Sequence, residues 1–281
     1  MKGLLALVLL AAFSCAGAEV AIPSGDASAP SIPATVLKPG GPGPFPAVVI
    51  LHDCSGLGPR SSGAPRRWAD ELVVKGYVAI LPDSFTPRGH PDGICTVPPG
   101  QRHPGVTPAR RANDAYAALA YLRTLPYVDG NRVAVMGGSH GGASTLATMV
   151  APQSKDRGFL AAVALYPACA INAGGWHDNL TGEYAPVGPV HILIGELDDW
   201  TPAENCRRLA EAAEKAGHLV TIKVYPGALH SFDNANPVHY VASRVNANAP
   251  GKRGATTGGQ PAAWADSIRE VLAFFGRYLG K

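Results

Sequence analysis

Short, continuous apolar runs recur along the chain and alternate with segments of helical periodicity. The first two runs, "PAVVILH" (residues 46–52) and "YVAILP" (residues 77–82), do not alternate between apolar and polar residues as a half-exposed strand would. Four further runs, "RVAVMG", "LAAVALY", "VHILIG" and "VTIKVY", end at Gly137, Tyr166, Gly195 and Tyr225. Strands of this kind are typical of a parallel sheet that is covered by helices on both faces.

The segments between these runs carry signals for helix starts. "TPARRANDAYAALAYLRT" opens with Thr107 as an N-cap and places a proline at the first helical position. In "TPAENCRRLAEAAEKAG", Thr201 and Glu204 have the spacing of a capping box. A final helix is predicted over Pro261–Leu279. This alternation of strands and helices predicts the α/β class, with a mostly parallel, doubly wound sheet.

Length and composition fit one folded domain. The chain has 281 residues, of which 46% are hydrophobic and 16% charged, so it can bury a large core. No internal repeat or linker is evident, and we assign residues 19–281 to a single domain. Two Pro/Gly-rich stretches, residues 23–44 and 246–260, are interpreted as loops, the first with an edge hairpin. The formal net charge is +3 with lysines and arginines scattered singly, which indicates neither a nucleic-acid-binding nor a membrane-binding patch.

The first eighteen residues differ from the rest. Lys2 precedes the apolar run "GLLALVLLAAF", which is too short to span a bilayer, and the tripeptide "AGA" that ends at Ala18 has the form of a cleavage site. We therefore predict a signal peptide over residues 1–18 and a secreted or periplasmic protein, with no integral membrane segment after cleavage. A lipoprotein anchored through Cys15 and a buried N-terminal helix are the alternatives.

Four cysteines follow the predicted signal peptide: Cys54, Cys95, Cys169 and Cys206. An even number in an oxidising compartment suggests two disulfides. We expect Cys54 to pair with Cys95 and Cys169 with Cys206, because each pair would join loops at the same edge of the sheet. Free buried thiols remain the alternative. The spacing of cysteines and histidines does not suggest a metal site.

The motif with the clearest chemistry is Gly-x-Ser-x-Gly, in which Ser139 lies between Gly137 and Gly141. It follows the run "RVAVMG" and precedes the helical segment "GASTLATMV", which is the context of a nucleophile elbow. A turn this tight strains the serine backbone, and side chains at the flanking positions would collide with the strand or the helix. Ser139 is therefore the predicted nucleophile.

A serine hydroxyl needs a base and an orienting acid, and in this fold the acid and then the histidine follow the serine along the chain. Asp198 lies just beyond the run "VHILIG", and His230 follows the next run. We therefore predict Asp198 as the acid and His230 as the base. Asp199 and Glu196 are the rivals for the acid. The other histidines lack a matching partner, and His52, at the end of a strand, is interpreted as structural.

The oxyanion of an acyl-transfer intermediate requires backbone N–H groups that are held in place in advance. The N–H of His140, directly after the nucleophile, is one candidate. The other is the N–H of Cys54 in the loop "HDCSGLG", with Ser55 next in order. An ordinary glycine turn is the alternative interpretation of this loop.

Five segments together resemble the dienelactone hydrolase family of the α/β hydrolases: "VVILHDCSGLG", "GYVAILPDSF", "GGSHGG", "GELDDWTP" and "YPGALHSFD". The resemblance runs from about residue 46 to the C-terminal helix. It implies an α/β-hydrolase fold with Ser139, Asp198 and His230 as the triad, and Cys54 as an oxyanion donor through its backbone. The name-giving enzymes use cysteine as the nucleophile, so the serine here favours general esterase chemistry over dienelactone itself.

The resemblance implies roles for two further residues. In the family an arginine after the "PD" strand end binds the substrate carboxylate, and Arg88 lies one residue beyond that point. A surface or structural ion pair is the alternative role for Arg88. Asp53 falls where the family has an acid near the nucleophile, and its alternative role is to shape the loop.

The sequence thus predicts a secreted or periplasmic serine hydrolase that acts on small-molecule carboxylic esters or lactones through an acyl-enzyme. This chemistry requires no cofactor and no metal, and no nucleic-acid partner is expected. A peptidase or acyltransferase on the same fold would use the same triad, and a catalytically silent binding module is the candidate from another class. The natural substrate and the oligomeric state are left open, because loops such as residues 86–104, 169–186 and 234–260 shape the pockets.

Overall fold

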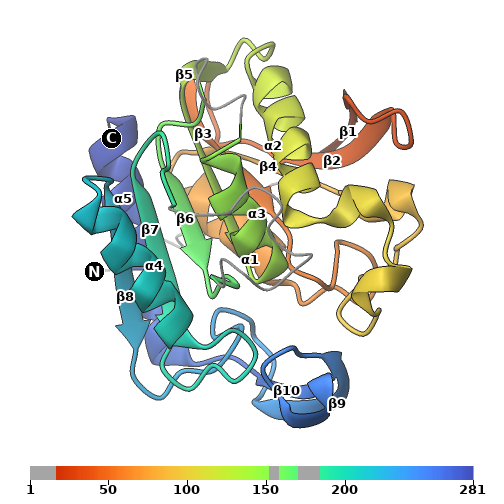
Figure 1. Cartoon of the computed structure of the whole chain (residues 1–281). Helices are drawn as coiled ribbons and strands as arrows, with labels where there is room; N and C mark the ends of the chain where they lie inside the picture. The colour runs from red at the N-terminus through yellow and green to blue at the C-terminus, as the bar shows by residue number, and fades with distance from the viewer. Residues whose placement is uncertain (1–16, 152–157, 170–183, 281) are drawn as a thin grey trace, which may run out of the picture.

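The computed structural model describes residues 17–151, 158–169 and 184–280 (Figure 1). Apart from Gly17 and Ala18, the predicted signal peptide lies outside these residues, and so does the alternative lipid anchor at Cys15. Much of the expected pocket loop over residues 169–186 lies outside them as well. None of the helices in the described ranges has the length and apolar character needed to cross a bilayer.

One large sheet forms the centre of the molecule. Its strands are β1 (Ala18–Pro23), β2 (Ser31–Leu37), β3 (Phe45–Leu51), β4 (Val78–Pro82), β5 (Val128–Gly138), β6 (Ala162–Leu165), β7 (Val190–Gly195) and β8 (Val220–Tyr225). They lie in the order β1-β2-β4-β3-β5-β6-β7-β8. The neighbours from β4 to β8 pair in parallel, whereas β1 with β2 and β2 with β4 are antiparallel. The predicted mostly parallel sheet is confirmed.

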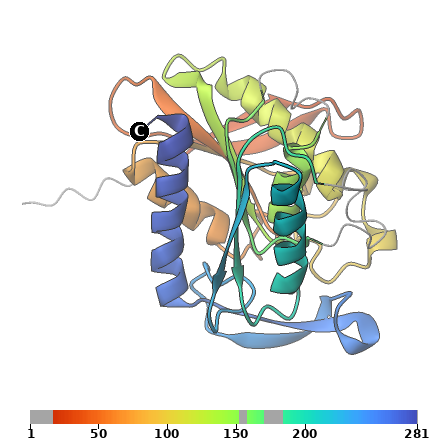
Figure 2. The same ribbon diagram turned by 60° about the vertical axis from the view of Figure 1, so that its left-hand side comes forward.

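Helices cover both faces of this sheet. They are α1 (Ala64–Val74), α2 (Pro108–Leu122), α3 (His140–Thr148), α4 (Ala203–Lys215) and α5 (Pro261–Leu279). Figure 2 shows α1 and α5 on one face, with α2, α3 and α4 on the other. Every residue of β4, β6 and β7 is buried between the two layers. This double coverage is the physical reason for the continuous apolar runs in the sequence.

The structure agrees in part with the prediction for one of the two Pro/Gly-rich stretches and differs from it for the other. An edge hairpin is present, but its first strand, β1, precedes the first stretch except for Pro23, and the stretch contains the turn and β2. The second is not a loop: it contains a short 3₁₀ turn (Pro250–Lys252) and β10 (Arg253–Thr257), which pairs antiparallel with β9 (His239–Val245). We call this ribbon of β9 and β10 the arm. It projects at the carboxyl end of the sheet (Figure 1), and most of β9 is exposed or half-buried, so no apolar run marks it in the sequence.

Candidate active site

Ser139 stands at the sharp turn between β5 and α3. Its backbone has a φ of 54° and a ψ of −116°, which is a strained conformation for a residue with a side chain. A Cβ on Gly137 would lie 2.6 Å from the backbone of Gly141, and a Cβ on Gly141 would overlap the carbonyl oxygen of Leu51. Glycine is therefore required at both positions, because the turn packs directly against the end of β3.

Ser139, His230 and Asp198 form a continuous hydrogen-bonded chain. Oγ of Ser139 lies 2.9 Å from Nε2 of His230, and Nδ1 of His230 lies 2.8 Å from Oδ2 of Asp198. Because a carboxylate only accepts, Nδ1 carries the proton and Nε2 accepts from the serine hydroxyl. The three buried side chains come from the turns after β5, β8 and β7. The structure thus brings together the residues that the sequence predicts as nucleophile, base and acid.

The carboxylate of Asp198 is held by the segment that leads into α4. Its Oδ1 accepts from the backbone N–H groups of Trp200 at 2.9 Å and Thr201 at 2.7 Å, and its Oδ2 lies 2.9 Å from the Thr201 hydroxyl. The predicted capping box of Thr201 and Glu204 is wrong: Pro202 is the N-cap of α4 and provides no side-chain cap. The helix begins one residue later than predicted, and the Thr201 hydroxyl lies beside Asp198 instead of at the N-cap position.

The two rivals of Asp198 have other partners. The carboxylate of Asp199 accepts from the backbone N–H of Thr256 in β10 at 2.9 Å and from the Thr256 hydroxyl at 2.8 Å. Glu196 is exposed and accepts from the backbone N–H of Gly227 at 3.0 Å. The two adjacent aspartates therefore bond to different parts of the molecule: Asp198 bonds to the imidazole of His230, and Asp199 bonds to the arm.

Aromatic rings enclose His230. The rings of Tyr166 and Trp200 each lie 4.8 Å from the imidazole, measured between centroids. The Tyr166 hydroxyl donates to the buried carboxylate of Asp233 at 2.7 Å, and that carboxylate also accepts from Nε1 of Trp68 at 2.7 Å. Burial raises the pKa of Asp233. The packing leaves His230 fully buried, so its contact with bulk water is confined to the cavity beside Ser139.

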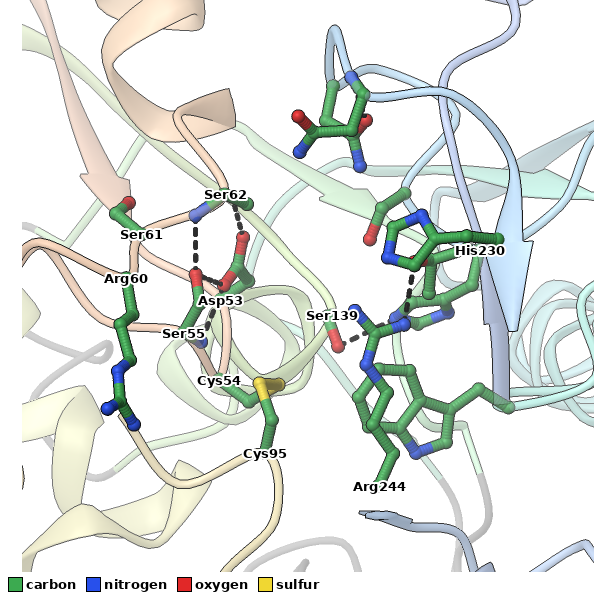
Figure 3. A pocket seen from close by; sticks show the side chains of 16 residues that line it. Asp53, Cys54, Ser55, Arg60, Ser61, Ser62, Cys95, Ser139, His230 and Arg244 are labelled. Carbon is green, nitrogen blue, oxygen red and sulfur yellow. Dashed lines mark hydrogen bonds between the residues drawn. A yellow bond between two sulfur atoms is a disulfide. The ribbon is translucent and has the colours of Figure 1, made fainter. Parts of the chain in front are cut away.

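A cavity of about 230 Å³ lies beside Ser139 and His230 (Figure 3). Hydroxyl, amide and charged side chains make up most of its lining. In Figure 3, Ser139 lies between the loop that carries Asp53 and Ser55 on one side and Arg244 on the other. Any group bound next to the serine hydroxyl therefore meets hydrogen-bonding side chains rather than an apolar tunnel.

The loop after β3 is organised around the carboxylate of Asp53. Its Oδ1 accepts from the backbone N–H of Ser55 at 2.7 Å and from the Ser55 hydroxyl at 2.5 Å, and its Oδ2 accepts from the Ser62 hydroxyl at 2.5 Å. These bonds are visible as dashed lines in Figure 3. They support the loop-shaping role for Asp53.

Both predicted disulfides are confirmed. One joins Cys54 in this loop to Cys95, and both of these residues line the cavity. The other joins Cys169, which follows β6, to Cys206 in α4. The alternative of free buried thiols at these four positions is wrong.

The two backbone groups predicted as oxyanion donors belong to His140, directly after Ser139, and to Cys54 in the loop after β3. His140 is the first residue of α3, where the helix dipole is positive. Cys54 lines the cavity together with Ser139. Both positions suit an oxyanion hole, and the donor roles stay predictions.

Arg88 does not line this cavity. Its side chain is 1% exposed, donates to both carboxylate oxygens of Asp114 at 2.8 and 2.9 Å, and pairs with Asp26 at 3.0 Å. A further bond goes to the carbonyl oxygen of Ser84 at 2.8 Å. A guanidinium engaged in this way has no donor directed at a substrate, so the geometry favours the structural ion pair over the substrate-binding role implied by the resemblance.

An arginine that does line the cavity, Arg244 of β9, is not singled out by the sequence. Its guanidinium lies 4.9 Å from the ring centre of Trp200 and donates to the Thr257 hydroxyl at 2.6 Å (Figure 3). Burial lowers the pKa of Arg244. The arm folds back onto the site through a bond of 2.8 Å from Nε1 of Trp200 to the carbonyl oxygen of Val245. No local sequence pattern predicts that a residue of β9 lines the cavity.

Known proteins resemble the chain over most of its length. The profile of the "Dienelactone hydrolase family" matches residues 32–279. A "Putative carboxymethylenebutenolidase" of Azospirillum brasilense is 27% identical over 235 residues, which cover 79% of this chain and 90% of the relative. A "Probable dipeptidyl-aminopeptidase B" of Fusarium vanettenii is 32% identical over 224 residues, which cover 68% of this chain and 23% of that protein.

A solved structure shows the same architecture. Esterase 2 of Thermogutta terrifontis, phosphoramylated by tabun, superimposes with a TM-score of 0.64 and 21% identity, over 94% of this chain and 95% of that chain. At this level of identity the likeness concerns the fold. The predicted α/β-hydrolase fold is thereby confirmed.

Proposed function

The chain belongs to the dienelactone hydrolase family and is a carboxylic ester hydrolase with a serine nucleophile, and we propose that Ser139, His230 and Asp198 carry out its reaction. Its substrates are small-molecule esters or lactones, which it cleaves through an acyl-enzyme. The observation that carries the assignment of residues is the unbroken hydrogen-bonded chain from Oγ of Ser139 through His230 to Asp198 beside the cavity.

In the first half-reaction, Nε2 of His230 takes the hydroxyl proton of Ser139 while Oγ attacks the carbonyl carbon of the ester. Asp198 accepts the Nδ1–H bond and stabilises the imidazolium that forms. The tetrahedral intermediate then expels the alkoxide, which receives the proton from Nε2. The acyl group remains on Ser139.

In the second half-reaction, Nε2 of His230 takes a proton from water while the water oxygen attacks the acyl carbon. The second tetrahedral intermediate breaks the bond to Oγ, and the proton returns from His230 to Ser139. The carboxylic acid leaves, and the side chains regain their starting protonation. With a lactone, the alcohol stays attached to the acyl group until this step releases the open hydroxy acid.

The negative oxygen of both intermediates is bound by the N–H groups of His140 and Cys54 in this proposal. Two preorganised backbone donors stabilise an oxyanion more than they stabilise the neutral carbonyl of the substrate, and this difference lowers the barrier. The start of α3 supports the first assignment, and the cavity-lining position of Cys54 supports the second.

The lining of the cavity supports compact, polar substrates. Asn234, Asn236 and Arg244 present amide and guanidinium groups to a space of about 230 Å³. A long alkyl chain placed there would desolvate these groups without replacing their hydrogen bonds. We therefore expect short or hydroxylated esters to be cleaved faster than fatty-acyl esters.

A fluorophosphonate probe and p-nitrophenyl acetate test the proposal together. We expect the probe to label the purified protein on Ser139, and the ester to be hydrolysed at a rate that Ser139→Ala abolishes. Hydrolysis that persists in Ser139→Ala would refute the assigned nucleophile. A protein that is neither labelled nor active would point instead to the non-catalytic binding module.

A peptidase is the second candidate, because the chain aligns with part of a dipeptidyl-aminopeptidase at 32% identity. The aligned segment is 23% of that relative, so more than three quarters of the relative has no counterpart in the alignment. Dipeptidyl p-nitroanilides distinguish the two activities. A kcat/KM for such anilides above that for simple esters would replace the esterase assignment.

Export from the cytoplasm completes the proposal. The two disulfides support an extracellular or periplasmic location, since structural disulfides persist in oxidising compartments. Mass spectrometry of the protein recovered from fractionated cells tests this. We expect a mature chain that begins at Glu19, whereas a chain that begins with a lipidated Cys15 would support the lipoprotein alternative.

A further inference from the structure

His52 is fully buried at the end of β3, directly before the loop that carries Cys54. Its Nδ1 lies 2.8 Å from the carbonyl oxygen of Asp53, and its Nε2 accepts from the backbone N–H of Ser84 at 3.2 Å. Because Nε2 accepts, Nδ1 carries the proton and donates to Asp53. Burial and the nearby charge of Arg111 lower the pKa of His52 to about 3, so the ring is neutral near pH 7.

The bond from His52 to Asp53 fixes a peptide plane. The carbonyl of Asp53 and the N–H of Cys54 belong to one trans peptide, so they point in opposite directions. A donor on the Asp53 oxygen therefore sets the direction of the Cys54 N–H. It also polarises the peptide group, which strengthens the N–H as a donor. The backbone N–H of Gly56 also bonds to this oxygen, at the longer distance of 3.3 Å, so the orientation of one predicted oxyanion donor depends on the ring of His52 together with Gly56.

Arg111 of α2 connects this plane to the nucleophile elbow. Its Nη2 donates to the carbonyl oxygen of His52 at 2.9 Å, and its Nη1 donates to Nδ1 of the His140 ring at 2.8 Å. His140 is the residue whose N–H is the other predicted oxyanion donor. One guanidinium therefore bridges the end of β3 and the start of α3, the two segments between which the oxyanion would form.

Arg111 is a buried cation that bonds to neutral groups. The side chain is 0% exposed, its two hydrogen-bond acceptors are a carbonyl oxygen and a ring nitrogen rather than a carboxylate, and its Nε has no hydrogen-bond partner among the described residues. Burial lowers the pKa of Arg111 to about 10, so the group keeps its charge near pH 7. The carboxylates of Asp114, Asp53 and Asp83 favour this charge through space, whereas the hydrogen bonds of the guanidinium go to neutral groups. The charge also favours a negative oxygen that forms between the two segments that Arg111 joins.

We propose that His52 and Arg111 are positioning residues that hold both oxyanion donors, the N–H groups of Cys54 and His140, in place before substrate binds. The inference rests on the proposed function, because an oxyanion hole has a task only in acyl transfer. His52 aligns the peptide of Cys54, and Arg111 joins that segment to α3 and contributes its charge. Neither residue lines the cavity, so their effect belongs to kcat rather than to KM.

Two variants of His52 distinguish its hydrogen bond to the Asp53–Cys54 peptide from the packing of its ring. In His52→Asn the amide nitrogen takes the place of Nδ1 and donates to Asp53, whereas in His52→Gln the amide reaches the Nε2 position instead. We expect His52→Gln to lower kcat for p-nitrophenyl acetate about 10- to 100-fold, and His52→Asn to retain most of the wild-type kcat. Each kcat is calculated from the concentration of active sites, which is measured by titration to completion with a fluorophosphonate. Unfolded protein therefore does not lower the measured kcat.

Arg111→Lys and Arg111→Met test the bridge and its charge. Lysine keeps the charge but cannot bond both acceptors with one planar group, and methionine keeps only the volume. We expect kcat to fall about 10- to 100-fold in Arg111→Met and by less in Arg111→Lys. An alkyl trifluoromethyl ketone, which forms an oxyanion adduct with the serine, should lose affinity in proportion to kcat/KM across the four variants. If His52 and Arg111 only stabilise the fold, the variants should have a smaller fraction of protein with a titratable active site and an unaltered affinity for the ketone.

His191→Asn is the matched control, because His191 is also a buried histidine and its Nδ1 bonds to the Thr221 hydroxyl at 2.8 Å, away from the cavity. It should change stability without changing kcat per active site. If the wild-type enzyme is labelled on Ser139 and hydrolyses esters while His52→Gln and Arg111→Met keep their kcat and ketone affinity, this inference fails and the proposed function stands. A wild-type protein without labelling or hydrolysis refutes the proposed function instead.

Discussion

The hydroxyl of Thr201 lies 2.9 Å from Oδ2 of Asp198, the same oxygen that accepts from the imidazole of His230. It also lies 3.1 Å from the carbonyl oxygen of Tyr166, which follows β6. Thr201 therefore connects the acid to the turn of the neighbouring strand. The position of the acid depends on this contact as well as on the two backbone donors.

Thr201→Val removes the hydroxyl and keeps the shape. We expect kcat to fall about 3- to 10-fold and the free energy of unfolding to fall by about 1–2 kcal/mol, because a partly buried hydrogen bond to a carboxylate is lost. Steady-state kinetics and urea unfolding measure the two effects. Thr201→Ser, which restores the hydroxyl, should recover both, and a variant Thr201→Val with unaltered kcat would show that the backbone donors suffice.

Asp198→Asn and Asp199→Asn are expected to behave differently although the residues are adjacent. Asp198→Asn should lower kcat about 10³- to 10⁴-fold, because an amide no longer fixes the tautomer or stabilises the imidazolium. Asp199→Asn should keep kcat within about threefold and raise KM, because it weakens the bonds to Thr256 that anchor the arm. Steady-state kinetics on one ester measures both, and the reverse ranking would exchange the roles of the two aspartates.

Arg88→Met tests whether Arg88 is structural. The substitution leaves the buried carboxylate of Asp114 without its partner, so we expect the free energy of unfolding to fall by about 3–5 kcal/mol. Activity per titrated site, and any preference for anionic over neutral esters, should be unchanged. A stable variant that loses only its activity on anionic esters would return Arg88 to the substrate-binding role.

Arg244→Met tests whether the guanidinium of Arg244 binds a negatively charged group of the substrate. Removing the guanidinium should raise KM for an ester with a free carboxylate about 10-fold and change KM for its neutral methyl ester little, because a charge-assisted hydrogen bond is lost from one substrate only. The neutral ester is the internal control. Equal effects on both substrates would mean that Arg244 acts by packing on Trp200.

The lowered pKa of His52 makes the free energy of unfolding depend on pH. Its pKa is lowered from 6.5 to about 3 in the folded protein, so below pH 6.5 the unfolded chain binds a proton that the folded protein does not. The stabilisation is therefore complete above pH 6.5 and decreases towards pH 3, by up to about 1.4 kcal/mol per pH unit. Urea unfolding between pH 7 and pH 4 should give a steeper decline for the wild type than for His52→Asn, and equal slopes would contradict the pKa shift.

Most of the sheet and the three residues of the proposed triad can be predicted from local sequence. Strands buried on both faces must be apolar throughout, so β4, β6 and β7 are visible as continuous runs. The helix α5 has the predicted bounds, Pro261–Leu279, because its first residue is a proline and a glycine follows its last residue. The elbow is recognisable since Gly137 and Gly141 are required by contacts with segments nearby in the fold.

The rest depends on contacts that are distant in sequence. The exposed arm is held by Asp199 and by Trp200, whose bonds to Thr256 and Val245 leave no periodic pattern. For the same reason Arg244 could not be recognised as a cavity residue. Thr201 has the spacing of a capping residue, but the helix begins after Pro202 and the Thr201 hydroxyl bonds to Asp198, a contact that no helix-start signal describes.

The order of the cysteines along the chain has a consequence for biosynthesis. Each disulfide joins two cysteines that are consecutive after the predicted signal peptide, with separations of 41 and 37 residues. When a chain enters an oxidising compartment with its N-terminus first, Cys95 arrives while Cys54 is the available thiol, and that pair can close before Cys169 appears. Oxidation in order of emergence therefore yields the native pairing without a disulfide isomerase. A recombinant host that supplies only a thiol oxidase should be sufficient to produce the protein with both disulfides.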